Sequence, residues 1–430
     1  MTWDFSTEPE FQAKLDWMET FVREEIEPVD AMWPDHVYER PMRAEVARVV
    51  RKLQGQVRNE NLWACHLGPE LAGQGYGQLK LALMNEILGR AVWAPTVFGC
   101  QAPDTGNAEI LAQFGTPEQK ALYLQPLLDG EITSCYSMTE PQGGSDPKVF
   151  TTSAVRDGDH WLISGTKYFS SNAKWASFLI VMAITDPNVA VHQGASMFIV
   201  PAGASGLSIE RNVGMVWEAI NEGSHALVHY DKVRVPVEAM LGGEGQAFRV
   251  AQTRLGGGRI HHAMRAVGQA QKALDMLCER ALSRFTQGSI LADKQTIQNL
   301  IADSYAEIMQ FRLFVAYVAW RIDALQDYKA VRRDIAAVKV LMPQDLHNVV
   351  SRAIQVHGAL GPTNELPLVR MLLQSVTLGL VDGPSEAHRV TVAREVLRHH
   401  HPSAGPWPSQ WLPARIEAAE EKFAANHGVA

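Results

Sequence analysis

Long segments of helical periodicity constrain the fold of this chain more than any other feature. Apolar residues recur at helical spacing over Gln246–Ser283, Lys294–Leu325 and Arg332–Val356, and again over the shorter Leu366–Leu378 and Ser385–His399. Helices of this length bury their apolar stripes against one another. The segments therefore predict a helical bundle as the C-terminal domain.

The middle of the chain has the texture of β-strands. The pair Asp157-Gly158 is a turn signal between the short runs Thr152–Val155 and His160–Ser164, which predicts a β-hairpin. Three more runs with strand-like composition follow: Ser177–Thr185, Ser196–Val200 and Ala226–Val235. We therefore expect a β domain of roughly one hundred residues.

The first third is predicted to be helical, with two capping boxes as start signals. Thr7–Glu10 and Thr116–Gln119 each place a threonine three residues before Glu or Gln, so that each side chain can bond the other's backbone. Pro117 adds the proline favoured at a first helical position. The predicted order is an N-terminal helical domain (1–133), a middle β domain (134–243), a C-terminal helical domain (244–402) and a C-terminal extension (403–430) that packs on the body or on a neighbouring subunit.

Composition limits the classes of function. The 430 residues carry a formal net charge of -8, which argues against a general nucleic-acid binder. The four cysteines include no CxxC pair, so we expect no metal site and free thiols in a reducing compartment. The N-terminus has no basic region followed by an apolar stretch, and no apolar run is long enough to span a bilayer. We therefore expect a cytoplasmic protein without a membrane span.

A cofactor signal lies at Tyr136–Asp146, which reads YSMTEPQGGSD. The two common nucleotide-binding patterns, GxGxxG after a strand and GxxxxGK[ST], do not occur in the chain. A turn rich in glycine, serine and threonine instead offers N–H groups and hydroxyls that suit the carbonyl oxygens and N1 of an isoalloxazine ring. An ordinary β-turn is the alternative for this segment taken alone.

This segment resembles the motif A-M-T-E-P-x-x-G-S-D of the acyl-CoA dehydrogenase family. Further segments similar to that family extend over nearly the whole chain: Asp104–Ala108, Phe114–Thr116, Leu127–Ile132, Gly165–Ala173, Gly243–Gly245, Val267–Gly268, Arg284, Gln295, Gln355–Gly361 and Val392–Glu395. The resemblance implies an α+β fold of the acyl-CoA dehydrogenase type, with an N-terminal α-helical domain, a middle β-barrel-like domain and a C-terminal four-helix bundle. It also implies FAD as the cofactor and a homodimer, or a dimer of dimers, as the assembly.

The resemblance assigns the flavin ring to two segments of one chain. The residues expected there are Tyr136, Met138, Thr139, Gly144, Ser145, Phe169 and Ser171, and Ser145 is also expected to contact the acyl-CoA. Phe169 and Ser171 stand where the family usually has tryptophan and threonine. An aromatic ring and a hydroxyl near flavin N5 are therefore kept.

A second group of family positions is expected to bind the FAD of the neighbouring subunit. Its members are Arg284, Thr286, Gln295, Gln355, Gly358 and Gly361. A guanidinium such as that of Arg284 suits a pyrophosphate because it donates two parallel charged hydrogen bonds. Taken alone, Arg284 is more simply a solvated helix residue. Ala359 replaces a glycine of the family's loop, and the phenylalanine expected after Thr286 is missing.

The family's catalytic glutamate corresponds to Asp382. The reaction implied by the resemblance oxidises an acyl-CoA thioester to a trans-2-enoyl-CoA. A carboxylate removes the α-proton, hydride leaves the β-carbon for flavin N5, and the electrons pass to an electron-transferring flavoprotein. Aspartate is shorter than glutamate by one C–C bond, roughly 1.5 Å, so the backbone or the substrate must shift. The alternative role of Asp382 is to cap the helix that follows.

Residues around this position are also assigned by resemblance. Val381 and Gly383 are expected at the substrate, and Pro384 and Glu386 at FAD. Some family members carry the base on an earlier helix, at the position of Gly258, and glycine cannot act as a base. The neighbouring Arg259 is expected near the acyl-CoA, with a structural ion pair as its alternative.

The segments Leu255–His262 and Asp382–His388 resemble a subgroup, family members ten and eleven, that also uses aspartate. The acyl group stays open, and a 4-hydroxy or 4-phosphoryl acyl-CoA is an alternative substrate. A nitroalkane-oxidase-like flavin oxidase is a second alternative, because it too uses aspartate and a serine near N5. The residues around Arg259 and His261 argue against it. A third alternative is a non-catalytic, DNA-associated relative, which the acidic charge and the intact base position disfavour.

Overall fold

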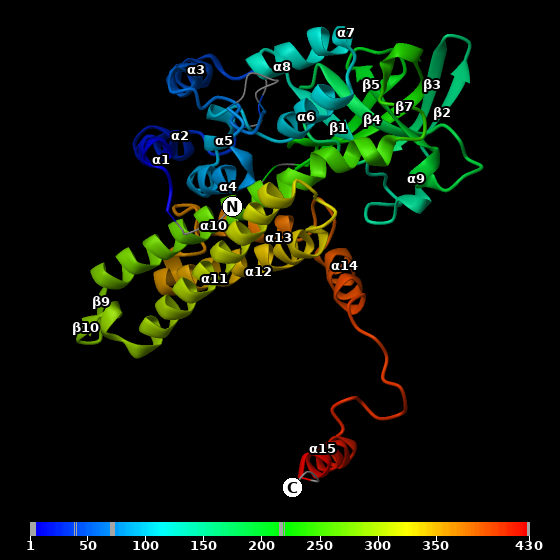
Figure 1. Cartoon of the computed structure of the whole chain (residues 1–430). Helices are drawn as coiled ribbons and strands as arrows, with labels where there is room; N and C mark the ends of the chain where they lie inside the picture. The colour runs from blue at the N-terminus through cyan, green and yellow to red at the C-terminus, as the bar shows by residue number, and fades with distance from the viewer. Residues whose placement is uncertain are drawn as a thin grey trace.

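The computed structural model describes residues 6–37, 39, 41–68, 74–214, 218 and 220–427. The first five residues and the side chains of 253–257, which include Leu255 of the subgroup segment, lie outside the described part. Figure 1 shows N-terminal helices in blue, a β domain in cyan and green, a helical bundle in green to orange, and one helix at the C-terminus that stands apart.

The N-terminal domain is a set of short and medium helices, of which the earlier ones surround an apolar core and the later ones pack against the middle domain. Its helices are α1 (Pro9–Phe21), α2 (Glu27–Met32), α3 (Ala44–Asn59), α4 (Gly77–Leu88), α5 (Ala94–Val97), α6 (Asp104–Phe114), α7 (Pro117–Gln119) and α8 (Gln125–Asp129), with π-helical turns at Val22–Ile26 and Lys120–Leu124. The Thr116–Gln119 capping box is confirmed. The Thr7–Glu10 box is wrong, because α1 begins one residue later with Glu8 as its N-cap and no side-chain cap bond.

The middle domain is an eight-stranded sheet. Its strands are β1 (Ser134–Ser137), β2 (Ser153–Asp157), β3 (His160–Lys167), β4 (Phe178–Ile184), β5 (Ala195–Pro201), β6 (Leu207–Val213), β7 (His225–Pro236) and β8 (Met240–Leu241), in the order β6-β7-β3-β2-β4-β5-β8 with β1 beside β4. A short helix, α9 (Val191–Gly194), precedes β5. Alternate residues of β4 enter two different apolar clusters, because successive side chains point to opposite faces. A strand covered on both faces reads as an unbroken apolar run.

The C-terminal domain is the predicted bundle. Its helices are α10 (Ala247–Ser283), α11 (Gln295–Leu325), α12 (Arg332–His357), α13 (Leu368–Leu378) and α14 (Ser385–Leu397), with a small hairpin of β9 (Phe285–Thr286) and β10 (Ser289–Ile290) between α10 and α11. Each helix begins and ends within two residues of the periodic segment that predicted it. Among the described residues, no helix combines the length and the apolar character needed to cross a membrane.

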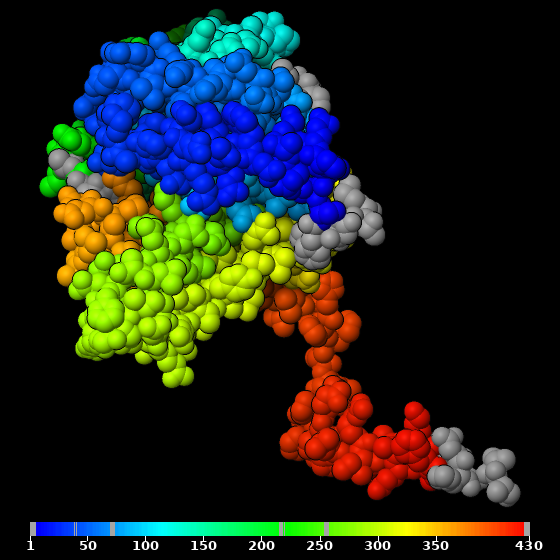
Figure 2. Space-filling model, turned by 90° about the vertical axis from the view of Figure 1, so that its left-hand side faces the viewer, coloured from blue at the N-terminus to red at the C-terminus, as the bar shows by residue number. Residues whose placement is uncertain are grey.

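The last helix, α15 (Leu412–His427), does not pack on the body. Figure 2 shows it below the body, joined to it by a narrow segment. Of the residues from 399 to 424, all but Ala419 are exposed. Packing on the chain's own body, one of the two roles expected for this extension, is therefore wrong for the single chain.

Helices α4 and α10 cross at glycines, and this contact joins the N-terminal domain to the bundle. A Cβ on Gly268 of α10 would lie 2.0 Å from the backbone oxygen of Glu86, and one on Gly89 would lie 2.2 Å from the backbone oxygen of Arg265. No side chain fits at such distances, so the two backbones pack directly.

We predict that Gly268→Ala destabilises the protein by about 1–3 kcal/mol or more, because the two helices must move apart. The matched control is Gly55→Ala inside α3, where a new Cβ meets nothing within 4 Å. That change should stabilise by about 0.5–1 kcal/mol through helix propensity. Urea unfolding measures both, and equal effects would contradict a glycine-specific contact.

Candidate active site

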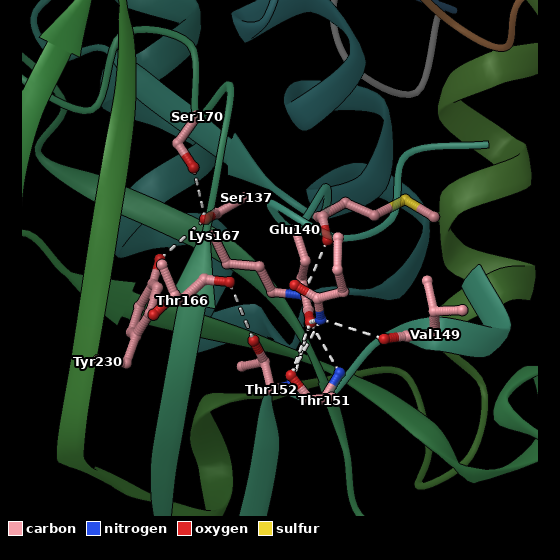
Figure 3. Close-up of polar contacts among 11 residues, drawn as sticks. Ser137, Glu140, Val149, Thr151, Thr152, Thr166, Lys167, Ser170 and Tyr230 are labelled. Atoms are coloured by element: carbon pink, nitrogen blue, oxygen red, sulfur yellow. Dashed lines mark hydrogen bonds and ion pairs between the residues drawn. The ribbon is translucent and has the colours of Figure 1, made fainter. Parts of the chain in front are cut away.

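Strand β1 leads into the turn of the first motif, and a buried ion pair anchors that turn. Lys167, the last residue of β3, donates to the carboxylate of Glu140 at 2.9 Å and to the carbonyl oxygen of Met138 at 2.8 Å. Both charged side chains are fully inaccessible to solvent. Figure 3 shows Lys167 and Glu140 pointing toward each other. The ion pair thus joins the two flavin segments predicted from the sequence.

Backbone and side-chain donors complete the coordination of Glu140. Its carboxylate accepts from the N–H groups of Thr151 at 2.7 Å and Thr152 at 3.0 Å, and from the amide of Gln142 at 2.6 Å. Burial raises the pKa of Glu140, but Lys167 and these donors outweigh it and hold the pKa at about 2. Burial lowers the pKa of Lys167 to about 8, against the opposing pull of Glu140. Both groups are therefore charged near neutral pH.

Further hydrogen bonds hold the second flavin segment beside the first. The N–H of Tyr168 donates to the carbonyl oxygen of Thr139 at 2.8 Å. The hydroxyl of Ser137 lies 2.8 Å from that of Ser170 and 2.9 Å from that of Tyr230, and all three side chains are buried. These contacts fix the chain just after β3, where the aromatic ring and hydroxyl expected at the flavin are found.

Phe169 and Ser171 differ in how they are held. Phe169 has a left-handed backbone (φ 54°), and 51% of it is exposed although its ring lies 4.1 Å from that of Tyr168. Ser171 forms an isolated bridge with Tyr136, and its hydroxyl lies 2.9 Å from Nδ1 of His225. Sequence reasoning missed His225, because it begins β7 and no local pattern relates it to Ser171.

The remaining residues of the first motif lie on the turn itself. Glu140 and Gly143 close the turn through backbone hydrogen bonds of 3.0 and 3.1 Å. Met138 and Thr139 are half-buried, whereas Gly144 and Ser145 are exposed. The exposed part of the turn offers backbone N–H groups and a hydroxyl to a ligand.

Asp382 lies between α13 and α14, in a left-handed conformation (φ 54°) that aspartate adopts more readily than most residues. Its carbonyl oxygen accepts from the guanidinium of Arg259 at 3.3 Å and from Nε2 of His388 at 3.2 Å. The amine of Lys339 donates to the carbonyl oxygen of Leu378 at the start of the same turn. Three basic side chains from α10, α12 and α14 therefore surround this turn.

The geometry does not favour the capping alternative for Asp382. The N-cap of α14 is Pro384, and the helix begins at Ser385, so Asp382 stands two residues before the cap. Burial lowers the pKa of Lys339 to about 8, and the negative charge of Asp382 opposes this shift. Burial also lowers the pKa of His388. The electrostatic coupling between Lys339 and Asp382 could not be read from the sequence, because 43 residues separate them.

The other residues predicted around Asp382 lie on or near the same turn. Gly383 has φ 95°, and a Cβ there would lie 3.0 Å from Nε2 of His388, so glycine leaves room for the histidine. Val381 is 40% exposed, and Glu386 is exposed with an ion pair to Arg389 at 3.4 Å. On α10, the Nε of Arg259 is buried without a hydrogen-bond partner.

A second group of predicted residues lies at the other end of the bundle. Arg284 directly follows α10, Thr286 pairs with Ser289 in the hairpin, and Gln295 begins α11. Figure 1 shows the hairpin remote from the turn between α13 and α14. Arg284 follows Arg259 by 25 positions on one helix, which is about 37 Å at 1.5 Å per residue.

The loop after α12 lies toward this hairpin end as well. Helix α12 runs antiparallel to α11, because Arg321 contacts Asp334 near one end and Glu307 contacts Arg352 toward the other. Gln355 therefore stands level with the first turns of α11.

The glycines of this loop differ in whether a side chain would fit at their positions. A Cβ on Gly361 would lie 2.3 Å from the backbone oxygen of Ile354, so this position requires glycine. Gly358 has φ 65° in open space, and Ala359 is exposed. Within one chain the predicted flavin residues thus form two groups that do not meet.

A helical domain, a β domain with this turn motif and a long helical bundle together define the fold class of the flavin-dependent acyl-CoA dehydrogenases. Family models agree in three consecutive parts: the N-terminal domain of acyl-CoA dehydrogenase at residues 8–131, the middle domain at 135–222 and the C-terminal domain at 245–397. The chain belongs to the acyl-CoA dehydrogenase family.

Individual relatives agree with this assignment. FadE2 of Mycobacterium tuberculosis, described as a probable acyl-CoA dehydrogenase, is 38% identical over 92% of this chain and 93% of its own length. Acyl-CoA dehydrogenase family member 11 of Gallus gallus is 41% identical over 80% of this chain, which spans only 45% of that longer protein. A solved structure from Mycobacterium abscessus, described as an acyl-CoA dehydrogenase, has a TM-score of 0.84 and 35% identity, covering 92% of this chain and 99% of that one.

Members of this family are FAD-dependent oxidoreductases that act on CH–CH groups, so FAD is the cofactor. The residues present fit such a cofactor. The half-exposed ring of Phe169 and the exposed turn at Gly144 and Ser145 offer an aromatic surface and polar donors to a flavin. The exposed Arg284 offers a guanidinium to a diphosphate.

We predict that removing one partner of the buried ion pair destabilises the protein strongly. Lys167→Met and Glu140→Gln should each cost about 3–5 kcal/mol, because each leaves a buried polar group unpaired, and the double variant should cost less than the two together. The exposed pair Arg23–Glu19 gives the control, since Arg23→Met should cost less than about 1 kcal/mol.

The pH dependence of wild-type stability follows from the same pair. The pKa of Glu140 is lower in the folded state (about 2) than its ordinary value of 4.5, so its contribution is complete above pH 4.5 and is lost as the pH falls toward 2. Urea unfolding between pH 7 and pH 3 measures this loss, which the double variant should lack. Equal pH profiles for the two proteins would contradict the assignment.

Proposed function

We propose that this protein oxidises an acyl-CoA thioester to a trans-2-enoyl-CoA and that Asp382 removes the α-proton. One observation carries the proposal: the family's base position is an aspartate in a left-handed turn, and Arg259, Lys339 and His388 bond backbone carbonyl oxygens of that turn. The positive charges of Arg259 and Lys339 interact with Asp382 and favour the ionised carboxylate that a base requires. Strained backbone conformations of this kind are concentrated at functional sites.

The developing charge of the substrate also needs stabilisation. Proton removal next to a thioester places negative charge on its carbonyl oxygen, which preorganised donors stabilise. The backbone N–H of Asp382 is the donor that family analogy assigns. Its peptide belongs to a turn whose carbonyl is held from two sides by Arg259 and His388. FAD, when bound, supplies the acceptor for the hydride that leaves the β-carbon.

The residues of this chain position the ring and the substrate. Phe169 offers its exposed ring face, and the Ser171 hydroxyl is oriented by His225. Ser145 is available to both the flavin and the acyl-CoA. The family also supports an electron-transferring flavoprotein as the partner that reoxidises the cofactor.

A substituted acyl group is a second candidate substrate, and unpaired polar groups favour it. The Nε of Arg259, both ring nitrogens of His66 and the Nε2 of His261 are buried and lack hydrogen-bond partners. Buried groups of this kind are costly unless a ligand or water pairs them. A 4-hydroxy or 4-phosphoryl acyl-CoA would bring oxygen atoms that a plain hydrocarbon chain does not have.

We predict that Asp382→Asn reduces the rate of acyl-CoA-dependent flavin reduction by at least about 1,000-fold, because the amide cannot accept the α-proton. FAD content should stay unchanged. The measurement is anaerobic bleaching of the flavin with a panel of straight, branched, 4-hydroxy and 4-phosphoryl acyl-CoAs. Glu395→Gln on α14, a carboxylate paired with Arg398, is the matched control and should keep the wild-type rate.

The same panel distinguishes the two substrate candidates by the rate at which each acyl-CoA reduces the flavin. Bleaching by none of the acyl-CoAs would overturn the proposed function. Peroxide formation from a nitroalkane without CoA would favour the oxidase alternative instead.

We also propose that Arg284, Thr286 and Gln295 complete the FAD site of a second subunit, because about 37 Å of helix separates Arg284 from Arg259 in one chain. Arg284→Ala should weaken FAD binding roughly tenfold to hundredfold, the effect of losing charged hydrogen bonds to a phosphate.

Purified hybrid dimers test which chain supplies the arginine. A hybrid of one Asp382→Asn chain and one Arg284→Ala chain should keep one working site. The matched control pairs a wild-type chain with a chain that carries both substitutions, and this hybrid should be impaired at both sites. The opposite order of activities would place Arg284 at the FAD of its own chain.

A further inference from the structure

The C-terminal arm, residues 398–427, lies beyond the part of the chain that the family model covers, which ends at residue 397. It consists of an irregular segment and helix α15. A helix of 16 residues is only marginally stable in water when it has no packing partner. We therefore expect α15 to be stabilised by packing on another protein surface.

Helix α15 carries one apolar stripe. The stripe consists of Leu412, Ile416, Ala419 and Phe423, which are spaced by four, three and four residues. This is the spacing of a seam between two packed helices. Leu412, Ile416 and Phe423 are 69%, 55% and 58% exposed, so the stripe is uncovered in the single chain.

Helix α14 carries a matching stripe on its outer face. Its buried residues, Ser385 and His388, face the body. Val390, Ala393 and Leu397 lie on the opposite side at spacings of three and four, and Val390 and Leu397 are 48% and 66% exposed. Each stripe has an alanine between larger residues, so a large side chain of one helix can fill the space beside the alanine of the other.

The chain does not fold back to join its own two stripes. The connecting segment contains Pro402, Pro406 and Pro408, which favour an extended backbone. The rings of Trp407 and Trp411 stack just before α15, with 4.8 Å between their centroids, and this contact stabilises the bend of the chain there. Figures 1 and 2 both show α15 away from the bundle that carries α14.

We propose that α15 of one copy packs on the outer face of α14 of a second copy, and that the second copy returns the same contact. A two-fold assembly requires each chain to carry both the donated helix and the surface that receives it, and this chain carries both. Arg389 and Arg394 flank the stripe of α14 on its two sides, so Glu420 beside the stripe of α15 can pair with one of them.

Disulfide trapping between two differently tagged chains tests the contact. One chain carries Ala393→Cys and the other Ala419→Cys, and the two are expressed together at full length. Mild oxidation should link them into a dimer that contains both tags. The matched control replaces Ala419→Cys by Ala418→Cys, off the stripe, and should give at least about tenfold less product because its effective concentration is lower. The native thiols are buried or half-buried, and wild-type chains supply their background.

A charge on the stripe provides the second arm of the test. Adding Ile416→Asp to the Ala419→Cys chain should abolish the cross-link and speed amide exchange across α14, whereas Ala418→Asp should do neither. The proposal is overturned if the two cysteines placed in one chain form only a monomer-sized product. It is equally overturned if no cross-link above the Ala418→Cys control is found.

Discussion

The ion pair between Glu140 and Lys167 is the interaction on which the β domain's part of the site depends. Two charges without solvent access are tolerated only because every oxygen of the carboxylate is hydrogen-bonded. The pair fixes the turn after β1 against the end of β3, and the backbone bond from Tyr168 to Thr139 continues that contact. Because Phe169 comes next in the chain, the same pair sets the position of the exposed ring. A polar anchor thus holds an aromatic surface in place.

The long helices impose a second constraint, because they separate the groups that a single cofactor needs. Arg259 lies in the first half of α10, whereas Arg284 directly follows the end of this helix. A straight helix keeps such groups apart regardless of side-chain rotamers. A ligand that must contact residues of both groups at one site can therefore do so more readily if two copies of the chain each supply one group. The contact proposed between α15 and the exposed stripe of α14 would also need a second copy of the chain, because each of these two surfaces would bind its partner in another copy.

The sequence predicts the helices of the bundle closely because apolar periodicity over many turns leaves little freedom in their ends. It predicts β4 and β5 for a related reason, since strands buried on both faces are unbroken apolar runs. Strand β6 was missed because most of its residues are exposed and polar, so its place follows only from pairing with β7. The Thr116 box forms while the Thr7 box does not, although the local pattern is the same, because Thr7 instead bonds the side chain of Gln12.

Site residues follow the same division. Those within the motifs could be found by resemblance, but His225 and Lys339 reach the site through tertiary packing that no local pattern encodes. Two side chains at the Asp382 turn also bear on the shorter aspartate. Gly383 has no side chain, which leaves room for the His388 ring. The carbonyl oxygen of Asp382 accepts hydrogen bonds from both His388 and Arg259. The orientation of the Asp382 peptide, and with it the direction in which the side chain leaves the backbone, is then set by two side chains from different helices. Because the side chain of aspartate is one bond shorter than that of glutamate, the position of its backbone decides whether the carboxylate reaches the substrate. In this protein that position is set by side-chain packing.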